Sequence, residues 1–168
     1  LLFAAAAGMS YGTDRTVNPA GGAMYLTIAA AVADAAPGDR ILCAAGNYAA
    51  GANIDKPLAI LGAQAGVDAR TGRPGAAESV ITGGGLGIFV LNAAGITIDG
   101  FKFANMAHRT IDTYFNADDF TIRNCIFTGD VNNYQGGAIQ FGGGSALHAH
   151  NFLFERNLML IDGGYLLY

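Results

Sequence analysis

The stretch from Asn92 to Phe103 recurs 24 positions later as the stretch from Asn116 to Phe127. Asn, Ala, Thr, Ile and the closing Phe return at the same places in both copies. A fixed period of this length is typical of solenoids, in which each repeat buries its apolar face only by stacking on its neighbours. The repeat therefore predicts a solenoid.

Each copy alternates apolar and polar residues with the period of two that is typical of strands. Gly100 and Asn124 interrupt the alternation at equivalent places, so each is expected to form a corner between two short strands. The pattern predicts an all-β fold, a parallel β-helix. The residues expected to face inward are Ile96, Ile98, Phe101 and Phe103, and those expected to face outward are Thr97, Asp99 and Lys102.

A short capping α-helix is expected near the amino terminus, before the coils begin. Thr27 is placed to cap its first turn, and Pro37-Gly38-Asp39 should end it. Because the first coil of a solenoid has an open apolar end, we expect this helix to cover it. Its apolar stripe consists of Ile28, Ala31, Val32 and Ala35.

Short apolar runs bounded by turn residues predict the other strands, at 40–44, 58–62, 79–82 and 88–91, with a corner at 46–48. The segment 63–78 is a long loop, and loops of this length are often functional. After Phe127 the period lengthens, and Asn157 is matched to Asn124, 33 positions earlier. This match would turn Glu155 inward, so the last unit is expected to contain a bulge.

A series of short motifs runs along the chain from Thr16 to the end: Leu26-Thr27-Ile28, Ala36-Pro37-Gly38-Asp39-Arg40-Ile41, Gly46-Asn47-Tyr48, Lys56-Pro57-Leu58 and Ile98-Asp99-Gly100-Phe101. Together they resemble the right-handed parallel β-helix proteins of the pectin-lyase-like superfamily. The resemblance implies a right-handed coil. It is specific for the fold and leaves the function open, because the superfamily includes polysaccharide lyases, glycoside hydrolases, uronate epimerases, phage tailspikes and adhesins.

The domain organisation is expected to be simple. Residues 1–15 are read as either the end of a secretory signal peptide or a first strand, since Leu1 to Gly8 is an apolar run ending in small residues. This run is too short to span a membrane. Residues 16–168 are expected to form one β-helix domain. The strand pattern persists to the last residues, so we expect further coils of a longer chain to follow.

Composition narrows the function. The chain has 168 residues, 52% of them hydrophobic, which suits one sizeable core. Only 13% are charged, the formal net charge is -4, and the nine Lys and Arg residues are scattered, which argues against a nucleic-acid partner. Cys43 and Cys125 occupy apolar strand positions at least two coils apart, so both are expected to be buried thiols.

Outward residues of successive coils should form ladders about 5 Å apart on a flat face. One ladder is expected to contain Phe89, Asp112, Gln140 and Leu166. Beside it lie the best catalytic candidates, which are Asp112, Arg109 and His108. The candidates for binding substrate are Gln140, Tyr114, Tyr134 and Lys102, the tyrosines because the chain has no Trp for stacking on sugars.

Enzymes of the superfamily typically use an Arg, Lys or His base with Ca²⁺ or a cationic group, or paired carboxylates. This ladder has one clear carboxylate, so no metal site or cofactor is predicted, and Ca²⁺ enters only if the protein is an enzyme. Other polar residues have simpler interpretations. Asp118-Asp119 is expected to be a turn, Asp99 and Arg123 a surface ion pair, Asn124 and Asn157 a corner ladder, and His148 and His150 either polar loop residues or a metal pair.

The leading hypothesis is a secreted or cell-surface β-helix module that presents a rigid face to a polysaccharide or a cell-surface glycan. The alternative is a polysaccharide lyase, uronate epimerase or glycoside hydrolase that acts near Asp112.

Overall fold

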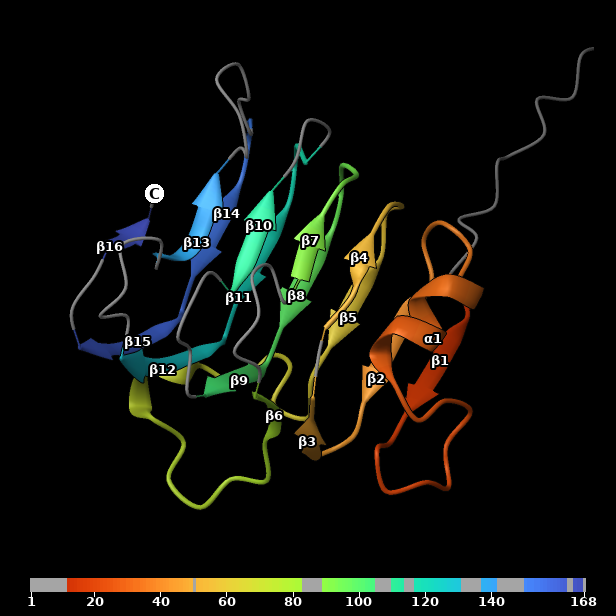
Figure 1. Cartoon of the computed structure of the whole chain (residues 1–168), viewed down its shortest axis with the longest axis horizontal. Helices are drawn as coiled ribbons and strands as arrows, with labels where there is room; N and C mark the ends of the chain where they lie inside the picture. The colour runs from red at the N-terminus through yellow and green to blue at the C-terminus, as the bar shows by residue number, and fades with distance from the viewer. Residues whose placement is uncertain are drawn as a thin grey trace, which may run out of the picture.

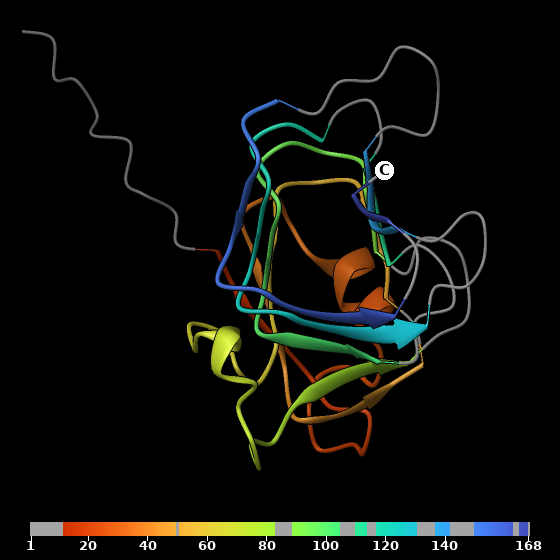
Figure 2. The same ribbon diagram turned by 90° about the vertical axis from the view of Figure 1, so that its left-hand side faces the viewer.

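The computed structural model describes residues 12–49, 51–82, 89–104, 110–113, 117–130, 137–141, 150–162 and 165–167. Its strands form three parallel sheets, and after β1 the chain visits them in turn, so that each circuit from β2 onward adds one strand to every sheet. Figure 1 shows the circuits side by side, and Figure 2 looks along the stack. The predicted fold class, a mostly β parallel β-helix with one short helix near the amino terminus, is confirmed.

We call the three sheets A, B and C in the order in which a coil visits them. Sheet A contains β1 (Asp14–Val17), β2 (Arg40–Cys43), β5 (Ala59–Leu61), β8 (Thr97–Asp99), β11 (Thr121–Arg123) and β14 (Leu153–Glu155). Sheet B contains β3 (Gly46–Tyr48), β6 (Ser79–Thr82), β9 (Phe101–Ala104), β12 (Ile126–Asp130) and β15 (Leu158–Asp162). Sheet C contains β4 (Asn53–Ile54), β7 (Phe89–Leu91), β10 (Ile111–Thr113), β13 (Gly137–Phe141) and β16 (Tyr165–Leu167). The expected corner at 46–48 is wrong, because these residues form β3.

The 24-residue repeat is confirmed by the strand register, since Thr97 pairs with Thr121 and Ile98 with Ile122. The next match was wrong by one residue. Arg123 pairs with Glu155, so Asn157 lies opposite Cys125 rather than opposite Asn124. Glu155 therefore keeps the outward position without a bulge.

Corners with positive φ flank the later strands of sheet A. Before β8, β11 and β14 the corner residues are Gly95, Asp119 and Asn151, with φ of 73°, 53° and 54°. After the same strands they are Gly100, Asn124 and Arg156, with φ of 77°, 51° and 53°. Glycine, Asn and Asp are the residues that adopt this backbone most readily, which explains why the repeat places them there. The predicted turn at Asp118-Asp119 is confirmed.

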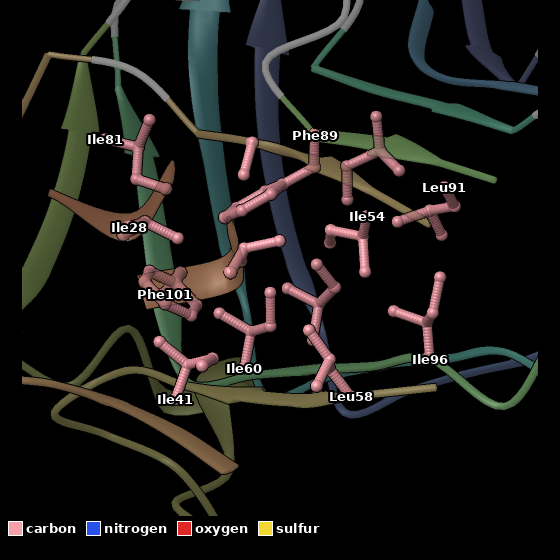
Figure 3. Packing of buried hydrophobic residues seen from close by; sticks show 14 of the residues in the cluster. Ile28, Ile41, Ile54, Leu58, Ile60, Ile81, Phe89, Leu91, Ile96 and Phe101 are labelled. Carbon is pink, nitrogen blue, oxygen red and sulfur yellow. The ribbon is translucent and has the colours of Figure 1, made fainter. Parts of the chain in front are cut away.

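The core is a column of apolar side chains stacked along the axis of the coils (Figure 3). All four predicted inward residues of the repeat are fully buried. Phe103 and Phe127 occupy the same place in successive coils, and their rings stack with centroids 4.8 Å apart. Both thiols, Cys43 and Cys125, are buried and free, as predicted.

The helix α1 (Ile28–Asp34) covers the amino-terminal end of this column. In Figure 2, which looks along the stack, α1 lies within the outline of the coils. Thr27 caps it as predicted, accepting a hydrogen bond from Ala30 N at 3.2 Å. Lys56 Nζ donates to the carbonyl oxygens of Val32 and Ala35, which closes the other end of the helix. The buried stripe is Ile28, Ala31, Val32 and Ala35.

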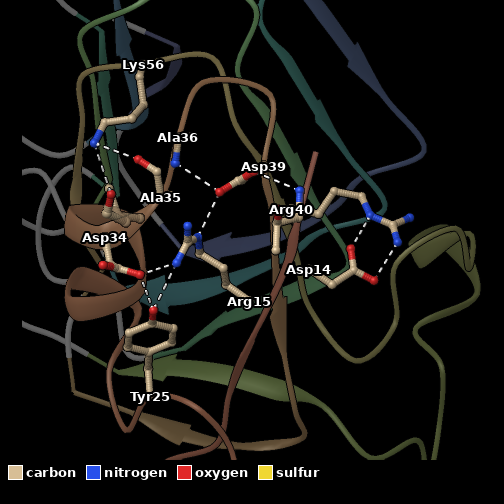
Figure 4. Close-up of polar contacts among 11 residues, drawn as sticks. Asp14, Arg15, Tyr25, Asp34, Ala35, Ala36, Asp39, Arg40 and Lys56 are labelled. Atoms are coloured by element: carbon tan, nitrogen blue, oxygen red, sulfur yellow. Dashed lines mark hydrogen bonds and ion pairs between the residues drawn. The ribbon is translucent and has the colours of Figure 1, made fainter. Parts of the chain in front are cut away.

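A polar cluster ties α1 to the first strands (Figure 4). Arg15 donates through Nε to Asp39 Oδ2 at 2.8 Å and also contacts Asp34 and Tyr25. The Asp39 carboxylate also accepts from the backbone N–H groups of Thr13 and Ala36. Hydrogen bonding from Arg15, helped by these two N–H groups, lowers the pKa of Asp39 below its usual value.

Replacing Ile98 by Ala should reduce the free energy of unfolding by about 2–5 kcal/mol, because it leaves a cavity in a fully buried rung. Thr97→Ala, on the outer face of the same strand, should change it by no more than about 0.5 kcal/mol. Urea unfolding of both variants checks the assignment. Equal effects at the two positions would contradict the inward and outward faces of β8.

Replacing Asp39 by Asn should lower the melting temperature at neutral pH. The folded-state pKa of Asp39 lies below its unfolded value of about 3.9, so its contribution is present above that pH and is lost as the pH falls through the folded pKa. The gap between parent and variant should therefore narrow from about pH 7 to about pH 3 in thermal melts. A gap that widens on acidification would refute this role.

Candidate functional site

The predicted ladder on the outer face of sheet C is partly confirmed. Asp112 pairs with Gln140, as expected. Its other neighbour is Val90, because Phe89 pairs with Ile111 and is fully buried. The predicted ladder has Phe89 one residue out of register, and a shift of one residue in a strand exchanges the two faces. Leu166 is also misplaced, since Leu167 is the residue that pairs with Ile139.

Asp112 is more enclosed than an outer-face residue usually is. Strand alternation puts it outside the core, opposite in direction to the fully buried Ile111, yet only 8% of its surface is exposed. Its neighbours Thr110 and Thr113 are also buried. The acidic side chain of Asp112 on sheet C is therefore largely shielded from solvent.

The other candidate residues are only partly located. His108, Arg109, Tyr114 and Tyr134 lie outside the described residues, and Gln140 is placed by its backbone register alone. Lys102 lies on the outer face of sheet B, between Val80 and Ile126. The structure therefore brings Asp112 and Gln140 together and puts Lys102 on a different face.

Four successive coils have connections of four to eleven residues on either side of sheet C, whereas the corners between sheets A and B have one or two residues, except for the segment 62–78 between β5 and β6. Sheet B is joined to sheet C by residues 49–52, 83–88, 105–110 and 131–136 in successive coils. Sheet C is joined to the next strand of sheet A by residues 55–58, 92–96, 114–120 and 142–152. Apart from the β5–β6 connection, the longer segments therefore lie at the ends of the sheet C strands, and segments of this kind on a rigid scaffold commonly carry binding residues.

A second polar site lies on sheet A. Asp99 accepts from Arg123 Nε at 2.8 Å, from Asn124 Nδ2 at 2.7 Å and from Gly66 N at 3.0 Å. The predicted ion pair with Arg123 is confirmed, but Asp99 is only 2% exposed and so does not lie at the surface. Its three donors satisfy a buried carboxylate, which is a structural role.

The remaining polar candidates also have structural partners. His150 Nδ1 lies 3.3 Å from Asp118 Oδ1, and His148 lies outside the described residues. The described part of the chain contains no group of three or more His, Cys, Asp or Glu side chains placed to hold a metal ion. The Asn157 side chain bonds Cys125 N and Ile122 O, and thereby satisfies backbone groups of the preceding coil.

The thiols of Cys43 and Cys125 are poor nucleophiles. Burial raises the pKa of each thiol to about 12. Both therefore stay protonated at neutral pH, whereas the reactive form of cysteine is the thiolate.

No family model, curated protein or solved structure matched this chain. Among the residues that the structure describes, no helix is both long and apolar enough to cross a membrane.

Replacing Asp99 by Asn should lower the free energy of unfolding by about 1.5–3 kcal/mol, because hydrogen bonds to a charged group are lost. Asp55→Asn is the control, since Asp55 is exposed and lies 3.5 Å from Lys56. Its effect should stay within about 0.5 kcal/mol in the same urea titration. Indistinguishable variants would show that the Asp99 cluster adds nothing to stability.

Proposed function

We propose that this protein is a β-helix module that binds a polysaccharide or a cell-surface glycan along the outer face of sheet C. Such a role implies secretion or display at a cell surface, where these polymers occur. We also propose a distant relationship to the pectin-lyase-like superfamily, which the sequence motifs and the three parallel sheets favour.

The ladder of Asn53, Val90, Asp112 and Gln140 carries the proposal. Each residue is in register with the next on adjacent strands, so they form a straight line with a spacing of about 4.8 Å. A polymer with a regular repeat can meet successive rungs of such a line. Because the coils hold the rungs in place before binding, little conformational entropy is lost on contact.

The enclosure of Asp112 supports the same face. Only the exposed edge of Asp112, 8% of its surface, can meet a ligand, and a hydrogen bond to a sugar hydroxyl in these partly desolvated surroundings is stronger than at an open surface.

The test is a binding panel of neutral and acidic polysaccharides, with Asp112→Asn as the variant. Asn keeps the size of the side chain, and loss of a hydrogen bond from a sugar hydroxyl to a charged acceptor should weaken binding by about tenfold or more. Asp14→Asn is the matched control, because Asp14 is a half-exposed acid that pairs with Arg40 on sheet A. It should bind like the parent protein. Thermal melts of both variants verify that they are folded.

Each outcome of the panel is informative. A parent protein that binds no polysaccharide would refute the proposed function. A loss of binding in Lys102→Gln but not in Asp112→Asn would move the contact to sheet B. New reducing ends or unsaturated uronates that disappear in Asp112→Asn would replace the binding role with the enzymatic alternative.

A further inference from the structure

The segment 63–78, which we call the brace, leaves sheet A after β5 and returns to sheet B at β6. It contains a short 3-10 helix at Ala69–Thr71. In Figure 2 it is the yellow-green segment outside the corner between sheets A and B. The brace therefore joins two strands of a single coil, but it also contacts several other coils.

The brace contacts the corner residue of each of the next three coils. Gln64 N donates to Gly100 O at 3.3 Å, at the corner after β8. Arg73 Nη1 donates to Asn124 O at 3.0 Å, at the corner after β11. Ala69 N donates to Arg156 O at 3.1 Å, at the corner after β14. The carbonyl oxygens of three successive corner residues, all with positive φ, thus accept hydrogen bonds from the brace.

Arg73 is the central residue of the brace. Its side chain is 2% exposed, and its guanidinium also contacts Glu78, with Nε 3.0 Å from Oε1 and Nη2 3.2 Å from Oε2. It donates as well to the carbonyl oxygens of Val67 and Gln64 within the brace. A buried cation with this many acceptors fixes its surroundings, because removing any partner leaves a desolvated charge.

The coil of β14, β15 and β16 is the most distant one that the brace contacts. At the amino-terminal end α1 covers the core, whereas β14, β15 and β16 are the last strands of their sheets in the described chain. Phe152, Leu153 and Leu160 are exposed there. In a solenoid each coil is stabilised mainly by its immediate neighbours, so a segment that contacts several coils adds stability that stacking alone does not supply.

We propose that the brace couples the β5 coil directly to the β8, β11 and β14 coils, and so holds the carboxyl-terminal coils to the body of the solenoid. It supplements the contacts between adjacent coils with contacts across one and two intervening coils. Local opening of the β14 coil then requires the brace to detach, which also breaks the contacts of Arg73.

Native-state hydrogen exchange on Arg73→Lys tests this coupling. Lysine keeps a charge beside Glu78 but cannot reach several acceptors in different directions as the guanidinium does. The amides of Leu153 and Leu158, which bond to Phe120 O and Cys125 O, should exchange about tenfold faster or more. The amides of Arg40 and Ala59 in the amino-terminal coils should change by less than about twofold.

Arg70→Lys is the matched control. Arg70 lies on the same segment, is largely exposed and pairs with Asp68 within the brace. Its replacement should leave all four amides unchanged. If Arg73→Lys accelerates all four equally, or if Arg70→Lys has the same effect, the brace is not a selective coupling and the proposal is wrong.

A double variant, Arg73→Met with Glu78→Gln, separates the coupling from the cost of a stranded charge. It removes the cation and the anion together, so any remaining effect comes from the lost contacts with the carbonyl oxygens of Asn124, Val67 and Gln64. Selective acceleration at Leu153 and Leu158 is again expected. Full protection of these amides in the double variant would overturn the proposal.

Discussion

The whole structure depends on the in-register stacking of inward apolar side chains. Ile41, Ile60, Ile98 and Ile122 occupy one position on successive strands of sheet A, and all are fully buried. Parallel strands allow this because identical positions lie directly above one another, about 4.8 Å apart. The outer faces inherit the same register, so any site on them is a consequence of how the core packs. A binding ladder on sheet C is therefore as regular as the column of side chains behind it.

Much of the fold could be predicted from the sequence because the signals are local. The 24-residue repeat, the inward residues Ile98 and Ile122, and the cap at Thr27 all follow from periodicity and turn chemistry. The errors have physical causes. Asn157 resembles Asn124 in sequence, but its side chain bonds Cys125 N and Ile122 O from the next position along the corner. Phe89 was misplaced because the residues before it give no alternation from which its direction can be read.

Of the candidate site, only the contact between Asp112 and Gln140 could be predicted. The two residues lie on adjacent coils, so the repeating strand pattern was sufficient to put them side by side. The burial of Asp99 was not predictable, since it depends on chain outside the repeat. For Asp99 that chain is the brace, whose Gly66 N–H supplies one of its three hydrogen bonds. Arg73 was missed for the same reason, because nothing in a loop sequence distinguishes a buried arginine from a solvated one.

The brace also limits the number of coils that can lie between its contacts. A parallel β-helix can in principle gain a coil by duplication of one repeat, because each new coil reproduces the surface on which it stacks. A 24-residue unit inserted between β11 and β14 would move the Arg156 corner about 4.8 Å further from Ala69, beyond hydrogen-bonding distance. The number of coils between β5 and β14 is thus limited by a segment of the β5 coil. Growth of the protein by repeat duplication is compatible with this structure only outside the interval that the brace spans.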